Sequence, residues 1–299
     1  IALGASIIAV QPNLTCKQPE LRTFFNTRDV RFAMNYAVNR DEMNELIYDG
    51  LYTPMQYSPL SVDPLFYPEQ AYSNLEYDPD KANDLLDAAG YTEKSADGFR
   101  LFPETGEIIS FEMEGLESSG SPYEDAMILV SQYWQAIGIK AVYKYAERSL
   151  YEEHQQANEM LVGTWSADRT VMPLLDPGIF LGTNTQRPWA DAWGQWRNDP
   201  TQPNAEEPPA DHWIRTMWNL WDEIKVEGSE EVRTAKFHEI LDVWKEEMPM
   251  QGFLGEAPTP VIKNKHLHNY IAGYPEGWLT HGISVLNCAT FYYDDPENH

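Results

Sequence analysis

Residues 25–51, FNTRDVRFAMNYAVNRDEMNELIYDGL, constrain the fold most, because their apolar residues repeat with the spacing of two short consecutive helices. Asn26 is a favourable N-cap for the first helix, and Asn39 interrupts its pattern. Asp41 opens the second helix, and Gly50 supplies a C-terminal stop. The stretch therefore predicts a buried helix pair.

The residue identities of this stretch are more specific than the spacing of its apolar residues. The run DVRFAMNYAVNRDEM at residues 29–43 resembles a signature of the family 5 solute-binding proteins of ABC transporters, the oligopeptide/nickel-binding type. Three further runs resemble that family in its own order: YDPDKANDLLDAAGY at 77–91, WQAIGIKAVYK at 134–144, and WSADR at 165–169, which Asp176 and Pro177 follow. The resemblance implies a non-catalytic protein that captures a solute outside the membrane and delivers it to a permease.

The remaining periodicity favours an α/β fold. Helical patterns alternate with short runs of β-forming residues, which indicates a lobe built around a mixed sheet. The expected helices cover residues 78–90, 122–137, 149–157, about 211–221 and 229–246, and the expected strands cover 5–14, 108–113, 139–145, 160–165, 251–254 and 260–262. Residues 170–209 are poor in aliphatic side chains and rich in Pro and Gly, so we expect a long functional loop there.

The resemblance also implies a division of the chain. It indicates a class II periplasmic-binding-protein fold, in which residues 1–255 form the second lobe and residues 256–299 complete a first lobe whose N-terminal part this chain lacks. Such a protein closes two lobes about a hinge around its ligand. We expect a monomer in the periplasm or outside the cell, associated with the membrane.

The net charge limits the binding partners, and the cysteine content bears on disulfide formation. Forty-seven acidic and 21 basic residues give a net charge of −26, which repels phosphate backbones and makes nucleic acid an improbable partner. A well-solvated surface accounts for such a charge. Cys16 and Cys288 can form a disulfide outside the cell or can both stay reduced.

The first candidate site is the run that contains Trp165, Asp168 and Arg169. Ligands of α/β sheets bind beyond the carboxyl ends of strands, and a carboxylate suits an ammonium group or a pair of sugar hydroxyls. In peptide-binding members of the resembled family, an aspartate at the position of Asp168 pairs with the peptide's amino group. The alternative is that Asp168 caps a turn and that Trp165 belongs to the core.

The second candidate site is a tryptophan run, Trp189, Trp193 and Trp196. Aromatic faces stack on sugar rings and on peptide side chains, and a helical run would place all three on one face. Core packing is the alternative. Because the run resembles the oligosaccharide-binding subgroup of the family, we expect an oligosaccharide ligand, with an oligopeptide as the alternative.

Other chemistry has weak support. His266 and His268 lie two residues apart, but no Cys or carboxylate is evidently placed to complete a metal site. We therefore expect no catalytic residue, no metal and no cofactor. Two other hypotheses are a carbohydrate hydrolase that uses a carboxylate pair, and a protein-interaction domain.

Overall fold

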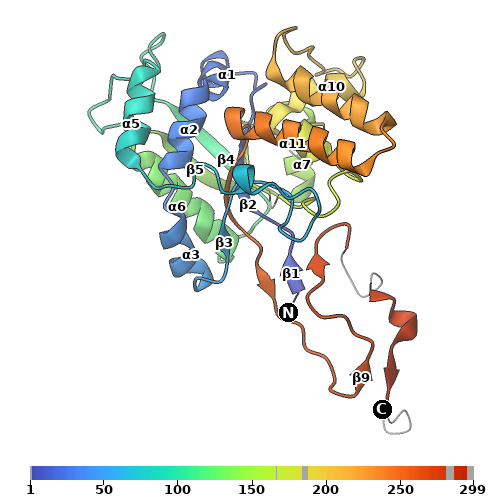
Figure 1. Ribbon diagram of the computed structural model, residues 1–299. Helices are drawn as coiled ribbons and strands as arrows, with labels where there is room; N and C mark the ends of the chain where they lie inside the picture. Colours follow the sequence, from blue (N-terminus) through green and yellow to red (C-terminus); the bar gives the residue numbers. More distant parts are fainter. Residues whose placement is uncertain (1, 166, 184–187, 281–285, 295–299) are drawn as a thin grey trace.

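The computed structural model describes residues 2–165, 167–183, 188–280 and 286–294 (Figure 1). The helical elements are α1 (Pro19–Asn26), α2 (Arg28–Tyr36), α3 (Arg40–Tyr48), α4 (Pro68–Ala71), α5 (Pro79–Ala88), α6 (Pro122–Ala136), α7 (Arg148–Gln156), α8 (Gly178–Leu181), η1 (Pro188–Ala190), α9 (Asp191–Asn198), α10 (Trp213–Val226), α11 (Glu230–Glu247) and η3 (Cys288–Thr290). The strands are β1 (Ala2–Gly4), β2 (Ile8–Pro12), β3 (Thr53–Pro54), β4 (Ser110–Gly115), β5 (Lys140–Tyr145), β6 (Val162–Gly163), β7 (Gln251–Gly255), β8 (Pro258–Thr259), β9 (Leu267–His268), β10 (Pro275–Glu276) and β11 (Tyr292–Tyr293).

A mixed six-stranded sheet organises the fold, in the order β3-β7-β2-β6-β4-β5. Strand β4 pairs parallel with β5 and β6, whereas β2 pairs antiparallel with β6 and β7. Strands β2 and β7 are buried along their whole length, as expected for central strands. The predicted α/β class with a mixed sheet is confirmed.

Local sequence signals explain where most helices begin. Asp78 caps α5, with its side chain accepting a hydrogen bond from the Lys81 amide. Ser121 caps α6 through the Glu124 amide in the same way. Asn26, however, is not an N-cap: it is the last residue of α1, and its side chain donates to the carbonyl oxygens of two other residues.

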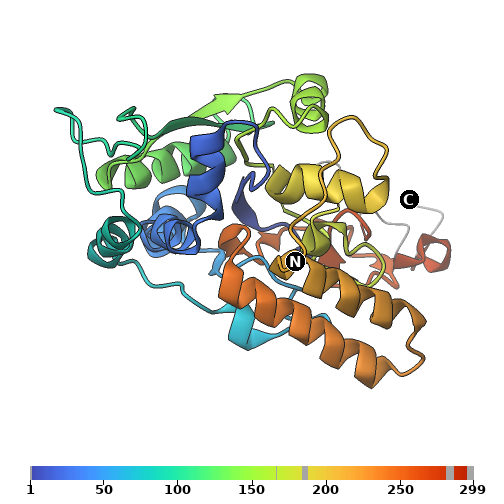
Figure 2. The same cartoon turned by 90° about the horizontal axis from the view of Figure 1, so that it is seen from above.

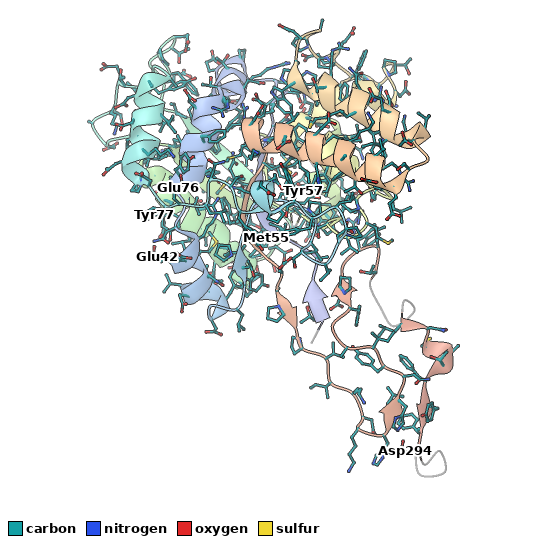
Figure 3. All side chains as sticks on the ribbon, in the orientation of Figure 1. Glu42, Met55, Tyr57, Glu76, Tyr77 and Asp294 are labelled. Atoms are coloured by element: carbon teal, nitrogen blue, oxygen red, sulfur yellow. The ribbon has the colours of Figure 1, made fainter. Side chains whose placement is uncertain are left out.

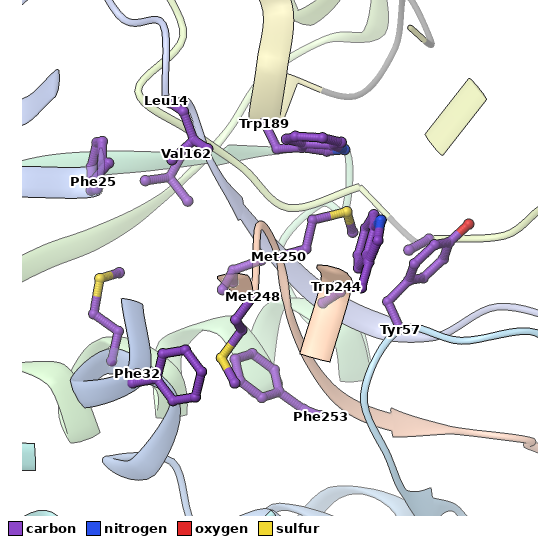
Figure 4. Packing of buried hydrophobic residues seen from close by; sticks show 14 of the residues in the cluster. Leu14, Phe25, Phe32, Tyr57, Val162, Trp189, Trp244, Met248, Met250 and Phe253 are labelled. Carbon is purple, nitrogen blue, oxygen red and sulfur yellow. The ribbon is translucent and has the colours of Figure 1, made fainter. Parts of the chain in front are cut away.

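Two groups of helices lie on different sides of the molecule. In one group helix α2 packs against α5, and in the other α10 packs against α11 (Figure 2). The indole of Trp134 on α6 donates a 2.8 Å hydrogen bond to the carbonyl oxygen of Met34 on α2. Both groups share one core, which is rich in aromatic side chains (Figure 4).

The expected loop at residues 170–209 is partly helical, which corrects the prediction. Helices α8 and α9 and the short η1 lie within this range. Pro, Gly and Trp obscure the helical pattern, and tertiary packing supplies the stability instead.

The segment after β7 extends away from the helices (Figure 1). Strand β1 lies between β8 and β10, while β9 and β11 form a separate antiparallel pair. Figure 3 places Asp294 in this extended segment, far from Tyr57 in the lobe. The assignment of residues 256–299 to a first lobe stays a prediction.

Two further features bear on the sequence-based expectations. Cys16 is buried, Cys288 is exposed, and both are free thiols, so the structure shows the unpaired alternative. None of the helices in the described ranges combines the length and the apolar character needed to cross a membrane.

Candidate functional site

The segment around Trp165 and Asp168 lies just beyond the end of β6. Ala167 forms a two-way backbone bridge with Ile7, with N···O distances of 2.8 and 3.0 Å. This bridge fixes the segment to the N-terminal strand region, beside the carboxyl ends of β4 and β6. The expected site therefore occupies the edge of the sheet where α/β proteins bind ligands.

Asp168 belongs to a charged cluster. Its Oδ2 accepts a 3.2 Å hydrogen bond from Nη1 of Arg169, and Nε of Arg169 lies 2.5 Å from Oδ2 of Asp176. The Tyr57 hydroxyl donates a 2.8 Å hydrogen bond to the Asp168 carbonyl oxygen. The guanidinium of Arg169 thus contacts two carboxylates.

Arg169 holds an unusual conformation within this cluster. Its φ of 70° lies in the left-handed region, which non-glycine residues rarely adopt. Its guanidinium also lies 5.1 Å from the ring centroid of Trp278, a half-exposed residue in the C-terminal segment. The charged cluster therefore contacts the segment that follows the lobe.

Trp165 is partly buried beside the cluster. Its ring meets Tyr151 edge to face with 5.6 Å between centroids, and the Arg148 guanidinium lies 5.1 Å above the ring. Trp165 thus has both an anchored edge and a partly accessible surface. The alternative that Trp165 belongs to the core therefore describes only the buried part of its side chain.

The tryptophan run does not form an exposed platform. Trp189 and Trp193 are 0 % and 2 % exposed, and Trp196, which is partly buried, stacks on Trp218 at 6.2 Å. Trp189 lies among buried hydrophobic residues (Figure 4), and its indole donates a 2.9 Å hydrogen bond to the Ile179 carbonyl oxygen. The run is helical, but it faces inward, so the core alternative describes Trp189 and Trp193.

The histidine pair has a neighbour that sequence spacing did not reveal. Asp294 contacts both His266, at 3.0 Å, and His268, across the β9–β11 pair. All three side chains are well exposed. Within the described ranges, no group of three His, Cys, Asp or Glu side chains is arranged to hold a metal ion.

A cavity of about 480 Å³ adjoins the N-terminal strand region. Ser6 and Ile8 line it next to the Ile7–Ala167 bridge, together with Tyr48, Tyr52 and Glu117. Sequence reasoning missed these residues, because nothing in their spacing links the second helix of the pair to the strand region.

Residues 2–184 match the family model described as bacterial extracellular solute-binding proteins, family 5 middle. The chain belongs to this family. Its motif arginines, Arg31 and Arg40, are both buried, so the family signature of residues 29–43 is at least partly structural.

Individual relatives agree with this assignment. The nickel-binding periplasmic protein of Escherichia coli (strain K12) is 27 % identical over 223 residues, covering 72 % of this chain and 37 % of the relative. The oligopeptide-binding protein OppA has a TM-score of 0.82 and 25 % identity, covering 98 % of this chain and 48 % of that structure. A periplasmic binding protein from Agrobacterium fabrum C58, solved with stachyose, has a TM-score of 0.69 and 12 % identity, covering 84 % and 38 %.

This chain matches only part of each relative's length. The chain spans about half the length of OppA and 37 % of the nickel-binding relative. All three relatives are described as binding proteins.

Proposed function

We propose that this chain provides one lobe of an extracytoplasmic solute-binding protein that serves an ABC importer. In this proposal residues 1–255 form the lobe, residues 256–299 join a facing lobe, and closure about the hinge buries the solute. Family membership supports the proposal, and so does the position of the Trp165–Arg169 run beside the N-terminal strand region.

The ligand that best suits the site carries an ammonium group, and an oligopeptide is our first choice. The observation that carries this choice is the Asp168–Arg169–Asp176 cluster, which places two carboxylates beside the end of β6. A peptide's amino group can donate to the Asp168 carboxylate through a charge-assisted hydrogen bond. The likeness to OppA supports the same choice.

An oligosaccharide is the second candidate. The expected stacking platform at 189–196 is its weakest support, because Trp189 and Trp193 are buried. Trp165 keeps a partly accessible ring beside two carboxylates, which suits a sugar ring and its hydroxyl groups. The stachyose complex of the Agrobacterium fabrum protein supports this candidate.

Calorimetric titration of the intact protein with short peptides and with oligosaccharides tests the proposal. We expect binding of peptides, weakened by Asp168→Asn. Binding of oligosaccharides alone, lost in Trp165→Ala, would replace the first ligand class by the second. Turnover of a glycoside, lost when one carboxylate is neutralised, would contradict a non-catalytic role.

A further inference from the structure

A separate polar pocket of about 450 Å³ lies between the end of α7 and α9. Most of its lining residues carry an amide or a carboxylate side chain. The residues that matter for its chemistry are Gln155, Gln195, Asn198, Asn204, Asp191 and Asp199.

This pocket is remote from the Asp168 cluster. Helix α7 begins beside Trp165, where Arg148 covers the indole ring, and it ends at Gln156 on the pocket wall. Nine helical residues span roughly 13 Å. The pocket therefore lies toward the opposite end of the sheet from the proposed solute site, and it does not depend on the function proposed there.

The amide groups that line the pocket donate hydrogen bonds within the protein. Gln195 and Asn204 donate to the carbonyl oxygen of Gln156, at 3.2 and 2.9 Å. Asn198 donates to the carbonyl oxygen of Thr183 at 2.9 Å. An amide side chain carries two donor hydrogens and an acceptor oxygen, so these residues can also offer acceptors to a ligand.

Asp191 strengthens this acceptor character. It is 3 % exposed, and its Oδ1 accepts hydrogen bonds from Gln155 at 2.5 Å and from Gln195 at 3.1 Å. Its Oδ2 is buried and has no hydrogen-bond partner in the part of the chain that the structure describes. An unpaired buried carboxylate oxygen destabilises a fold, and Asp191 lines the pocket, so a ligand that donates to Asp191 would offset that cost.

We propose that this pocket binds a small organic cation, with an alkylammonium or alkylguanidinium group donating to Asp191 and to the neighbouring amide oxygens. A cation supplies donors and carries the charge opposite to that of an ionised Asp191. A neutral polyol supplies donors without that charge. The net charge of −26 favours cations near the surface.

Titration calorimetry of the intact protein with butane-1,4-diamine and with butylguanidinium, at pH 8, tests the proposal, and glucose serves as the neutral probe. We expect saturable binding of the cations and none of glucose. Asp191→Asn should weaken cation binding by about tenfold or more, since one charged hydrogen bond is lost. Asn198→Lys, at an exposed position, places an ammonium in the pocket and should weaken binding while Asp191 is intact.

Asp168→Asn separates this site from the proposed solute site, because pocket binding should survive it. Loss of cation binding in Asp168→Asn but not in Asp191→Asn would overturn the proposal while leaving the solute site in place. Absence of saturable cation binding, or Asp191-dependent binding of glucose, would overturn it as well. Melting curves of each variant verify that the protein is folded.

Discussion

Arg40 donates a 2.9 Å hydrogen bond from Nη2 to the carbonyl oxygen of Gly252, which is 212 residues away in the sequence. The same guanidinium donates to the backbone and side chain of Asn35 and to the carbonyl oxygen of Leu75. Arg31 makes a similar connection, donating to the carbonyl oxygen of Glu247 at 2.9 Å. The two motif arginines thus connect the helix pair to the end of α11 and to β7.

Replacing Arg40 by Met should destabilise the protein strongly. Met preserves much of the side-chain volume but leaves several buried carbonyl oxygens without donors, and each such loss costs about 1–3 kcal/mol. We expect the free energy of unfolding to fall by roughly 3 kcal/mol, measured by urea denaturation.

Arg148→Met is the matched control. Arg148 is 60 % exposed and pairs with Glu152 on the same helix, so its loss should cost at most about 1 kcal/mol. Equal losses for the two variants would show that Arg40 does not have the structural role described here.

Trp189 and Trp165 should respond differently to truncation. Trp189→Ala removes a fully buried ring and should cost roughly 3–5 kcal/mol of stability. Trp165→Ala removes a partly exposed ring, so we expect a smaller loss of stability and a clear loss of solute binding. Trp189→Phe keeps an aromatic core, and if it weakened binding without lowering the denaturation midpoint, Trp189 would be a ligand contact after all.

Much of the fold follows from local signals in the sequence. Helices α5 and α6 begin at a capping residue followed by Pro, and both were predicted within about two residues. The alternation of strands and helices also predicted the mixed sheet. These features are readable because they depend on neighbours along the chain.

The rest depends on contacts between distant residues. Arg31 lies in the helix pair, but its partners Phe25, Asn26 and Glu247 come from α1 and from the end of α11. The spacing of Trp193 fits both a binding platform and core packing, and its packing against His212, 4.4 Å between ring centroids, depends on a distant residue. Which face of a helix is buried is decided by elements that a local pattern does not contain.

Asp191 should make stability depend on pH. Burial raises its pKa from 3.8 to about 7, despite the opposing charge of Lys17, so the folded protein binds this proton more tightly than the unfolded chain does. The cost of ionising it is absent below about pH 4, grows as the pH rises, and is complete above about pH 7. Asp191→Asn should therefore be more stable than the parent at pH 8, by roughly 1–4 kcal/mol, and nearly equal to it at pH 4.

Unfolding of both proteins across this pH range measures the difference directly. Other titrating groups, including Asp199 in the same pocket, are common to both proteins and cancel. A difference that stays constant from pH 4 to pH 8 would contradict the raised pKa.

The most direct test of the proposed solute site compares one tripeptide with a free amino terminus and the same tripeptide acetylated there. Acetylation removes the positive charge and leaves the side chains unchanged. We predict that the free peptide binds the intact protein, and that acetylation and Asp168→Asn each weaken binding by about tenfold or more, without further loss when combined. Equal affinity of the two peptides would contradict a role for Asp168 in holding the ligand's amino group.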